Sequence, residues 1–478
     1  MPKPDKTIVI YGSGLAAMMT AIALANGLSD AYRIVLANDS AETSADIFYG
    51  SVTAPGGYDF YRSLGLDEPI LFMNSATSFS FGTQYKNWPS RTGDWAQCHH
   101  QPLPLLAGVP LQHHLARNAV DLQPLLISAM AMQSGKFAHP PEDASIPLSR
   151  AEYGYQFSVQ EWTKLLTEIV EAGRVEMLSG SVENVESSEG KIAGFHLGAG
   201  ETIEADLYVD CSGPARHCLR ALAEDFHVTR SLSASYSRQA ATQLGPPARE
   251  VQAVPTGWVS RTFLQDAITT LDISHSDADG SFVDDFHCAL GRVKSAWVGN
   301  CVAIGHAAGV VEPLTPAPMM LLQRDIERLL ELVPVSADMT AERREFNRRF
   351  DDDFTHAEMF ANAFFANDKH TPSAYWDEAT SNAQTEPLQR KIAQFESRGL
   401  LVKYDLEPFN DEDWTILHNG MGRQAARYDL QVERIAKPDV QKQLSGMKQA
   451  VEQLVTRMPP HHLYVANMKS YLERQRNV

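Results

Sequence analysis

The chain has 478 residues, 44% of them hydrophobic and 21% charged, as in ordinary globular proteins. It carries 41 Lys and Arg residues against 59 Asp and Glu residues, a formal net charge of −18. This acidity excludes nucleic-acid backbones and anionic membranes as expected partners, because both require a basic surface that displaces counterions.

Cysteine usage and hydropathy narrow the expected compartment and class of protein further. The five cysteines lie at positions 98, 211, 218, 288 and 301 and form no CxxC pair, which excludes a disulfide scaffold and the usual zinc ribbons and predicts a reducing, cytoplasmic compartment. No apolar stretch approaches the roughly 20 residues of a spanning helix, so we expect no membrane segment. Adjacent histidines such as His99 and His100 point apart on a strand, so we also expect no metal site.

The N-terminal elements alternate between strand and helix. Residues 7–11 (TIVIY) predict a buried strand, residues 16–28 a helix, and residues 33–37 a second buried strand. Such a βαβ unit is typical of a parallel sheet that is covered on both faces.

The later elements follow the same alternation and then become helical. We expect a strand over 76–88, a helix over 158–173 with Ser158 as its N-cap, strands near 202–209 and 297–305, a helix over about 317–333, and further helices over 340–366, 386–398, 411–430 and 438–475. This order predicts an α/β core followed by a helical C-terminal region.

A dinucleotide-binding fingerprint stands between the first strand and the first helix. The string Gly12-Ser13-Gly14-Leu15-Ala16-Ala17 reads GxGxxA. The first glycine permits the tight turn, the second lets a diphosphate approach the backbone, and the final small residue lets helix and strand pack closely. The amides of Leu15 and Ala16 would face the diphosphate at the helix N-terminus. The fingerprint also expects an acid after the second strand to bind the ribose, and Asp39 is the candidate, one position beyond Asn38.

Two later segments turn this general nucleotide fold into a flavoprotein hypothesis. Residues 206–213 (DLYVDCSG) form a strand that ends at a glycine, and residues 302–314 (VAIGHAAGVVEPL) look like a late flavin motif. In order and spacing, residues 5–365 resemble the flavin-dependent tryptophan halogenase family of the FAD monooxygenase superfamily. The resemblance implies FAD as cofactor and a Rossmann-like FAD-binding module that is interleaved with a mixed β-sheet substrate domain.

The implied division of the chain has three parts. Residues 1–60, 150–222 and 295–335 would form the FAD-binding module, residues 61–149 and 223–294 the substrate-binding region, and residues 336–478 the helical C-terminal region. Only one fingerprint occurs, so electrons are expected from a separate flavin reductase or from NAD(P)H that binds transiently.

The chain departs from the halogenase pattern at the reacting groups. The family carries a lysine three residues before an Asn-Trp pair, and alignment on Asn87-Trp88 places Gln84 there, with Lys86 as a displaced substitute. The family's EPLEST motif reads EPLTPA here, so its Glu, Ser and Thr become Thr315, Pro316 and Ala317. His306 replaces the aspartate of the flavin motif, and the WxWxIP signature is reduced to WVSRTF beginning at Trp258.

These departures favour hydroxylation over halogenation. A halogenase needs a group that steers the oxidised halide and a base near the ring, whereas a hydroxylase needs neither. We therefore predict an FAD-dependent monooxygenase that hydroxylates an aromatic, indole-type substrate, either a small molecule or a tryptophan in a partner polypeptide. The alternatives are a tryptophan halogenase with an altered active site, a non-catalytic flavin-binding maturation partner, and an NAD-dependent dehydrogenase.

The predicted site has three sets of residues. The expected reaction side comprises Gln84, Lys86, His306 and Thr315. The expected cofactor contacts are Gly12, Gly14, Leu15, Ala16, Ala17, Asp39, Gly213, Gly305, His306, Glu312, Pro316 and Ala317. Phe79, Phe81, Trp88 and Trp258 are expected to line an aromatic substrate pocket, although core packing explains at least half of them equally well.

Overall fold

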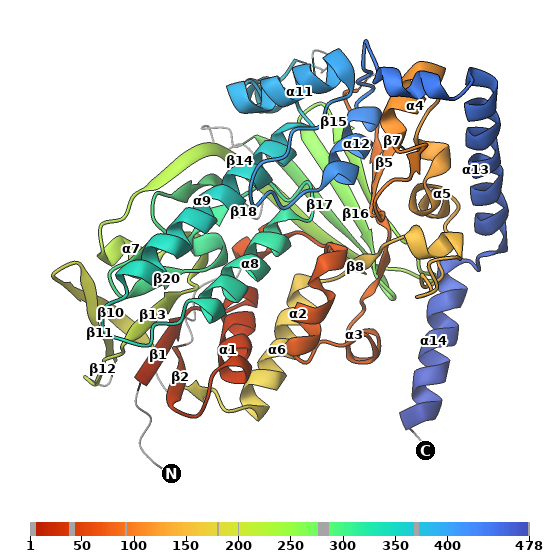
Figure 1. Ribbon diagram of the computed structural model, residues 1–478. Helices are drawn as coiled ribbons and strands as arrows, with labels where there is room; N and C mark the ends of the chain where they lie inside the picture. The colour runs from red at the N-terminus through yellow and green to blue at the C-terminus, as the bar shows by residue number, and fades with distance from the viewer. Residues whose placement is uncertain are drawn as a thin grey trace.

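A largely parallel sheet holds the N-terminal fingerprint (Figure 1). The computed structural model describes residues 6–37, 44–90, 93–178, 181–198, 200–275, 286–367 and 372–476. The strand order is β19–β20–β13–β1–β2–β9, with bounds Trp297–Val298, Cys301–Ala303, Leu207–Asp210, Lys6–Tyr11, Tyr32–Ala37 and Glu176–Met177. All neighbours pair in parallel except β19 and β20, so the carboxyl ends of β1, β13 and β20 meet at one edge.

Helices and a small sheet cover this parallel sheet. Helix α1 (Leu15–Gly27) contacts both α6 (Val159–Ala172) and α8 (Ala317–Glu331). The small sheet is antiparallel and consists of β10 (Val182–Ser188), β11 (Lys191–Leu197) and β12 (Thr202–Ile203). From β11, the ring of Phe195 packs against the parallel sheet, with its centroid 5.3 Å from that of Tyr11 and 4.9 Å from that of Tyr208. The α/β layering follows from β1, β2 and β13 being apolar on both faces.

A second, larger sheet has eight strands. Its order is β21–β18–β14–β17–β16–β15–β4–β5, with bounds Gly309–Val310, Phe286–Val293, Phe226–Ala240, Ala267–His275, Gly257–Phe263, Arg249–Val254, Gly82–Lys86 and Trp95–Cys98. Only β15 and β4 pair in parallel. Because β21 leads directly into the loop before α8, this sheet and the flavin motif are continuous along the chain.

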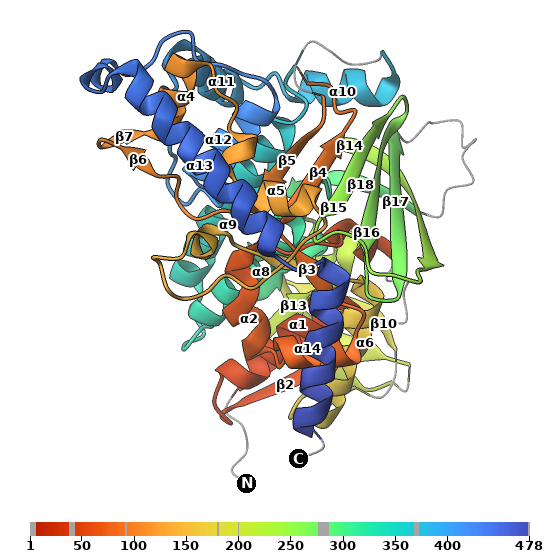
Figure 2. The same ribbon diagram turned by 90° about the vertical axis from the view of Figure 1, so that its right-hand side faces the viewer.

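The C-terminal region is helical (Figures 1 and 2). Its helices are α9 Thr340–Asn362, α10 Ala374–Asn382, α11 Glu386–Arg398, α12 Asp411–Gly420, α13 Lys437–Arg457 and α14 His461–Arg476. The expected helix over 438–475 is two helices, because Pro459 and Pro460 interrupt the backbone hydrogen bonding between α13 and α14. The helix expected over 411–430 already ends at Gly420.

Shorter elements connect these layers. They are η1 Ser44–Tyr49, η2 Pro55–Gly57, α2 Tyr58–Ser63, α3 Glu68–Asn74, β3 Ser78–Ser80, β6 Leu105–Leu106, β7 Val109–Pro110, α4 Leu111–Asn118, η3 Gln123–Leu125, α5 Ile127–Gln133, η4 Pro147–Arg150, β8 Gly154–Gln156, η5 Gly213–Ala215, α7 His217–Ala221, η6 Gly305–Ala307 and η7 Leu430–Arg434. In the described ranges, none of the helices combines the length and apolarity needed to cross a membrane.

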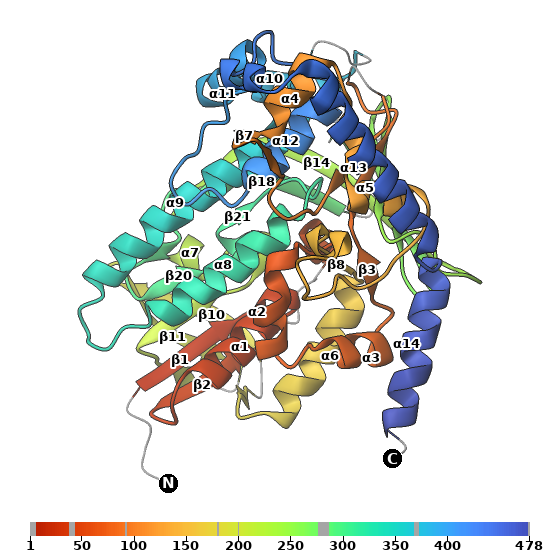
Figure 3. The same ribbon diagram turned by 45° about the vertical axis from the view of Figure 1, so that its right-hand side comes forward.

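The predicted fold class is confirmed, including the helical C-terminal region. Helices α8 and α9 pack side by side in front of the parallel sheet (Figures 1 and 3). The three-part division of the chain stays a prediction.

Candidate functional site

The fingerprint turn has the backbone geometry that a diphosphate requires. Gly12 and Gly14 have φ angles of +143° and +88°, and a Cβ on Gly12 would lie 2.3 Å from the carbonyl oxygen of Cys211. Ala17 is fully buried against the strands. Gly14 is the N-cap of α1, so the amides of Leu15, Ala16 and Ala17 form its first turn. The predicted cofactor residue Gly213 begins η5 with a φ of +62°, whereas Asp39 lies outside the described residues.

An acid already occupies this helix N-terminus. The N–H of Leu15 donates to Oδ2 of Asp46 at 2.8 Å. Burial raises the pKa of Asp46 to about 7, and the hydrogen bond from Leu15 opposes that rise. The carboxylate therefore holds the donor that a phosphate oxygen would use.

The predicted residue His306 lies in a sealed position. Its ring stacks on Tyr49 with centroids 3.7 Å apart and an interplanar angle of 5°, and its backbone N–H donates to the Tyr49 hydroxyl at 3.0 Å. Neither ring nitrogen makes a hydrogen bond of ordinary geometry, although Nδ1 or Nε2 faces the backbone of Phe48. Burial lowers the pKa of His306 to about 3, so the ring is neutral at pH 7 and is no proton donor there.

The adjoining Gly305 is held from the helix that follows the motif. Its N–H donates to Oδ2 of Asp325 at 3.1 Å, and Asp325 pairs with Arg328 at 3.0 Å. With a φ of +61°, Gly305 leaves its Cα side open to Tyr49, whose hydroxyl a Cβ would meet at 2.3 Å.

Glu312 anchors the loop from inside the protein. Its carboxylate pairs with Arg230 at 2.7 Å and accepts hydrogen bonds from Trp258 Nε1 at 2.7 Å and from the Tyr375 hydroxyl. Side chains of Arg230 and Glu312 are only 3% and 5% exposed. Trp258, predicted to line a pocket, is therefore a loop anchor, because its one polar atom is turned to Glu312.

The next part of the loop is held by a buried cation. Arg249 donates to the carbonyl oxygens of Pro313 (2.8 Å) and Leu314, and the Tyr85 hydroxyl donates to Leu314 O at 3.0 Å. Burial lowers the pKa of Arg249. These contacts fix Thr315, whose hydroxyl accepts from the N–H of Ala317 at 3.2 Å, and Pro316 then caps α8, which begins at Ala317.

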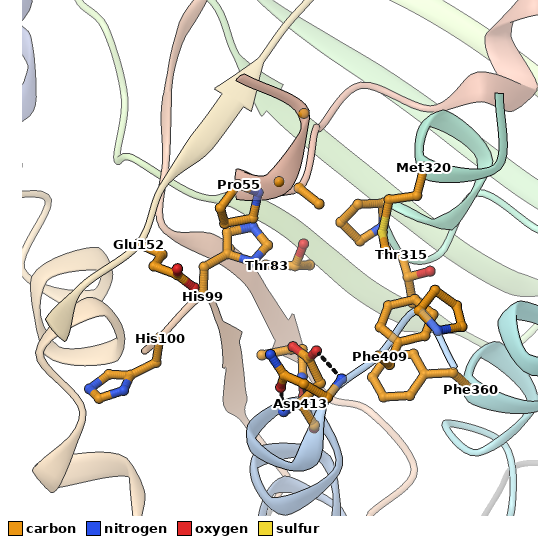
Figure 4. A pocket seen from close by; sticks show the side chains of 18 of the residues that line it. Pro55, Thr83, His99, His100, Glu152, Thr315, Met320, Phe360, Phe409 and Asp413 are labelled. Carbon is orange, nitrogen blue, oxygen red and sulfur yellow. Dashed lines mark hydrogen bonds between the residues drawn. The ribbon is translucent and has the colours of Figure 1, made fainter. Parts of the chain in front are cut away.

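A cavity of about 370 Å³ opens beside Thr315 and Pro316 (Figure 4). Its walls come from η2 with the residue before it, β4, β5 with the histidines after it, α8, α9 and the start of α12. Lining side chains labelled in Figure 4 are Pro55, Thr83, His99, His100, Glu152, Thr315, Met320, Phe360, Phe409 and Asp413. A volume of this size accommodates a small aromatic ligand.

His99, His100 and Glu152 lie on the side of the cavity away from Thr315, and Asp413 lies between them and Thr315 at the start of α12 (Figure 4). Burial raises the pKa of Asp413 to about 7, and burial with the nearby Glu412 raises the pKa of Glu152. Burial lowers the pKa of His99 to about 4, so this ring is neutral near pH 7, and its Nε2 has no hydrogen-bond partner. Asp413 is thus a group that can exchange a proton near neutrality.

The two faces of β4 separate the predicted reaction residues from this cavity. Thr83 and Tyr85 line the cavity, so Gln84 and Lys86 project from the opposite face of the strand. Lys86 pairs there with Glu250 at 2.8 Å and is 40% exposed. The structure does not bring Gln84 or Lys86 to Thr315.

The other predicted pocket aromatics pack in the core. Phe79 stacks on Phe137 with centroids 4.1 Å apart, and Phe81 contacts the same ring. Trp88 donates from Nε1 to the carbonyl oxygen of Phe364 at 2.9 Å. All three are buried and none lines the cavity, whose aromatic wall is made instead by Tyr85, Phe360 and Phe409.

Comparison with known proteins places the chain in a family. The tryptophan halogenase family model matches residues 7–437. Tryptophan 6-halogenase ThaL of Streptomyces albogriseolus is 24% identical over 459 residues, covering 85% of this chain and 84% of the relative. The flavin-dependent halogenase BrvH from Brevundimonas sp. BAL3 superposes with a TM-score of 0.87 at 23% identity, covering 97% and 99% of the two chains. Tryptophan 6-halogenase SttH from Streptomyces toxytricini gives a TM-score of 0.84 at 18% identity over 97% and 100%.

The chain belongs to the tryptophan halogenase family. Enzymes of this family use FAD, so the flavoprotein assignment, and with it the predicted family resemblance, is confirmed. The preference for hydroxylation is not supported, because the relatives are named as halogenases and the halogenase alternative fits them better.

The backbone of the site fits FAD, but the side chains, as they are arranged in this structure, do not. Gly12, Gly14 and Gly305 leave the close approaches that a dinucleotide needs. Asp46 and Tyr49, however, hold the donors of Leu15 and His306. The glycine turns therefore leave room for the cofactor, but Asp46 and Tyr49 of the chain itself fill that room.

Several residues of the site carry no sequence signal of their own. Asp413, His99 and Glu152 reach the cavity from segments without a recognisable motif, and Arg249 comes from a strand far along the chain. Asp46 follows the fingerprint by about thirty residues, and only its acidity in a segment after the second strand hints at the contact with Leu15.

Proposed function

We propose that this chain is a flavin-dependent oxidoreductase that modifies an aromatic, indole-type substrate in the cavity beside Thr315, and that the modification is halogenation. The proposal is carried by that cavity, which joins the loop of the flavin motif to a wall of carboxylates and aromatic rings. FAD, reduced by a separate flavin reductase, would supply the oxidising chemistry with O2. The net reaction converts an aromatic C–H, a halide, a proton, O2 and the two electrons and two protons of reduced flavin into a C–halogen bond and two waters.

The residues of the cavity serve this reaction in three ways. Tyr85, Phe360 and Phe409 offer apolar faces to an aromatic ring. Asp413 accepts the proton that the ring loses, because its pKa of about 7 makes it a competent base near neutrality. Glu152 and Glu327 line the cavity with Arg324, and the two carboxylates outnumber that one guanidinium, which favours a substrate that carries an amine.

Hydroxylation is the second candidate, and one observation favours it. Within the described part of the cavity wall there is no lysine, and Thr315 stands where the family carries glutamate. A hydroxylation uses O2 and the same two electrons but consumes no halide. A tryptophan within a partner polypeptide remains a candidate substrate for either reaction.

One assay separates the two reactions. The purified protein is incubated with FAD, a flavin reductase, NADH and O2, with chloride, bromide or no halide, and with indole, tryptamine, tryptophan or a tryptophan-containing peptide. Mass spectrometry then reports the product. Halogenated product that requires the halide supports the proposal, an oxygenated product without halide supports hydroxylation, and flavin binding without either product overturns both.

A further inference from the structure

The segment Asp46–Tyr49, within η1, lies between the nucleotide-binding fold and the larger sheet. Element η1 contacts α6, α8 and η5 of the nucleotide-binding fold and β18 of the larger sheet. Its side chains reach the two backbone donors that the family's motifs present, the N–H of Leu15 and the N–H of His306. We call Asp46–Tyr49 the plug.

Asp46 occupies the diphosphate position by chemistry as well as by place. In dinucleotide-binding folds the amide that follows the second glycine, together with the helix dipole, binds a phosphate oxygen. Here that amide is Leu15, and its acceptor is a carboxylate oxygen at 2.8 Å. A phosphate and Asp46 cannot use this donor at the same time.

Tyr49 closes the second contact. Its ring covers His306 at 3.7 Å, its hydroxyl accepts from the His306 N–H, and the void left beside them is about 10 Å³. This is at the lower limit for one water molecule. His306 is 2% exposed, and the backbone of Phe48 is at most a weak partner for one of its two ring nitrogens, so at least one buried nitrogen lacks a hydrogen bond, which costs free energy. A polar ligand in place of Tyr49 would accept instead from the backbone N–H of His306.

We propose that the plug is an internal competitor of FAD, so that the cofactor binds only when Asp46 and Tyr49 leave Leu15 and His306. The inference rests on the flavin dependence of the proposed function but not on which group the enzyme transfers. It explains how a complete glycine framework coexists with a filled cradle.

The test is FAD affinity, measured by fluorescence titration of the full chain at pH 8. Asp46→Ala removes the acceptor from Leu15 and should lower the Kd for FAD at least tenfold. Asp46→Asn keeps an oxygen that can accept from Leu15 and should bind FAD no more tightly than the wild type. Asp59→Ala is the matched control, because Asp59 is an exposed acid whose ion pair is with Arg62, and its Kd should stay within twofold.

A second measurement uses the unaltered protein. Saturating FAD should increase hydrogen exchange at the amides of the plug, because the segment leaves its packed position. The inference is overturned if Asp46→Ala changes the Kd by less than twofold, if FAD leaves exchange in the plug unchanged, or if no form binds FAD. Tighter binding by Asp46→Ala without any halogenated or oxygenated product would uphold the inference and overturn the proposed function.

Discussion

The site has two halves, one at the N-terminus of α1 and one at the cavity beside Thr315, and they preserve different features of a flavin-dependent enzyme. Around α1, the glycines and their φ angles suit a dinucleotide, but Asp46 and Tyr49 fill the space. Around Thr315, the space is open at about 370 Å³, but its described wall contains no lysine and has Thr315 and Pro316 after the EPL tripeptide. A fold can thus keep the backbone framework of a site whose space is filled, and keep an open cavity where the groups on its wall differ.

The difference has a physical basis in the loop that joins the halves. Residues 312–314 are held by Glu312 with Arg230, and by Arg249 on the carbonyls of Pro313 and Leu314. These contacts do not depend on the identity of residue 315. The loop can therefore carry Thr315 in place of glutamate and still keep its shape.

The largest expected effect is on this loop. Glu312→Ala would leave the buried guanidinium of Arg230 without its closest counter-ion, and should lower the free energy of unfolding by about 3–5 kcal/mol. Thr315→Ala removes only the acceptor for the Ala317 N–H and should cost about 1 kcal/mol. Urea denaturation measures both. Equal losses would mean that the Glu312 network does not hold the loop.

The next largest effect is expected on turnover in the cavity beside Thr315. Asp413→Asn should lower kcat about 100-fold with KM little changed, because the ring proton then lacks an acceptor whose pKa is near 7. The amide can still accept the capping hydrogen bond from the Asn410 N–H, so α12 should stay folded. Glu152→Gln makes the same charge change in the same cavity and serves as control. If Glu152→Gln is the more damaging variant, Glu152 rather than Asp413 is the base.

Much of the fold and part of the site are readable from sequence for local reasons. The βαβ unit follows from apolar strands and a GxGxxA turn, and the Ser158 hydroxyl caps α6 by accepting from the Glu161 N–H at 3.4 Å, as predicted. The EPL tripeptide likewise marks the loop that the cavity adjoins. Each of these signals lies within a few residues of what it determines.

The remaining features depend on partners that are distant along the chain. Which face of β4 meets the cavity is a matter of register, and a shift of one residue exchanges Gln84 and Lys86 for Thr83 and Tyr85. Trp258 resembles a pocket aromatic until Glu312, 54 residues later, is seen to accept its N–H. The contact of Asp46 with Leu15 belongs to the same class.

FAD affinity at the N-terminus of α1, where Asp46 fills the space, should depend on pH, and the direction of the change can be derived. With the plug in place, burial raises the pKa of Asp46 to about 7, whereas a released, hydrated Asp46 has a pKa near 4, as is usual for aspartate. The proton therefore stabilises the closed plug, and FAD affinity should fall about tenfold per pH unit from pH 7 to pH 5 and be constant above pH 7.

Other titratable groups near the plug could also make FAD affinity depend on pH, and their pKa values and the Asp46 variants separate them from Asp46. Burial raises the pKa of Tyr49 and Cys211 and lowers that of His306 to about 3, so these groups do not titrate in this range. Asp325, with a pKa of about 6, does titrate there and is common to all variants. Asp46→Ala and Asp46→Asn should flatten the profile. A slope that persists in both would assign it to Asp325 instead.

The smallest expected effect concerns the face of β4 turned from the cavity. Lys86→Ala removes an ion pair with Glu250 at a side chain that is 40% exposed, which should cost about 0–1 kcal/mol of stability. Turnover should stay within twofold of the wild type, because the ammonium group is on the opposite side of the strand from Thr83 and Tyr85. Thr83→Val changes the cavity wall itself at similar volume and should alter KM. If Lys86→Ala instead abolished turnover with FAD affinity intact, Lys86 would be the reacting lysine, and β4 would have to expose its other face during the reaction.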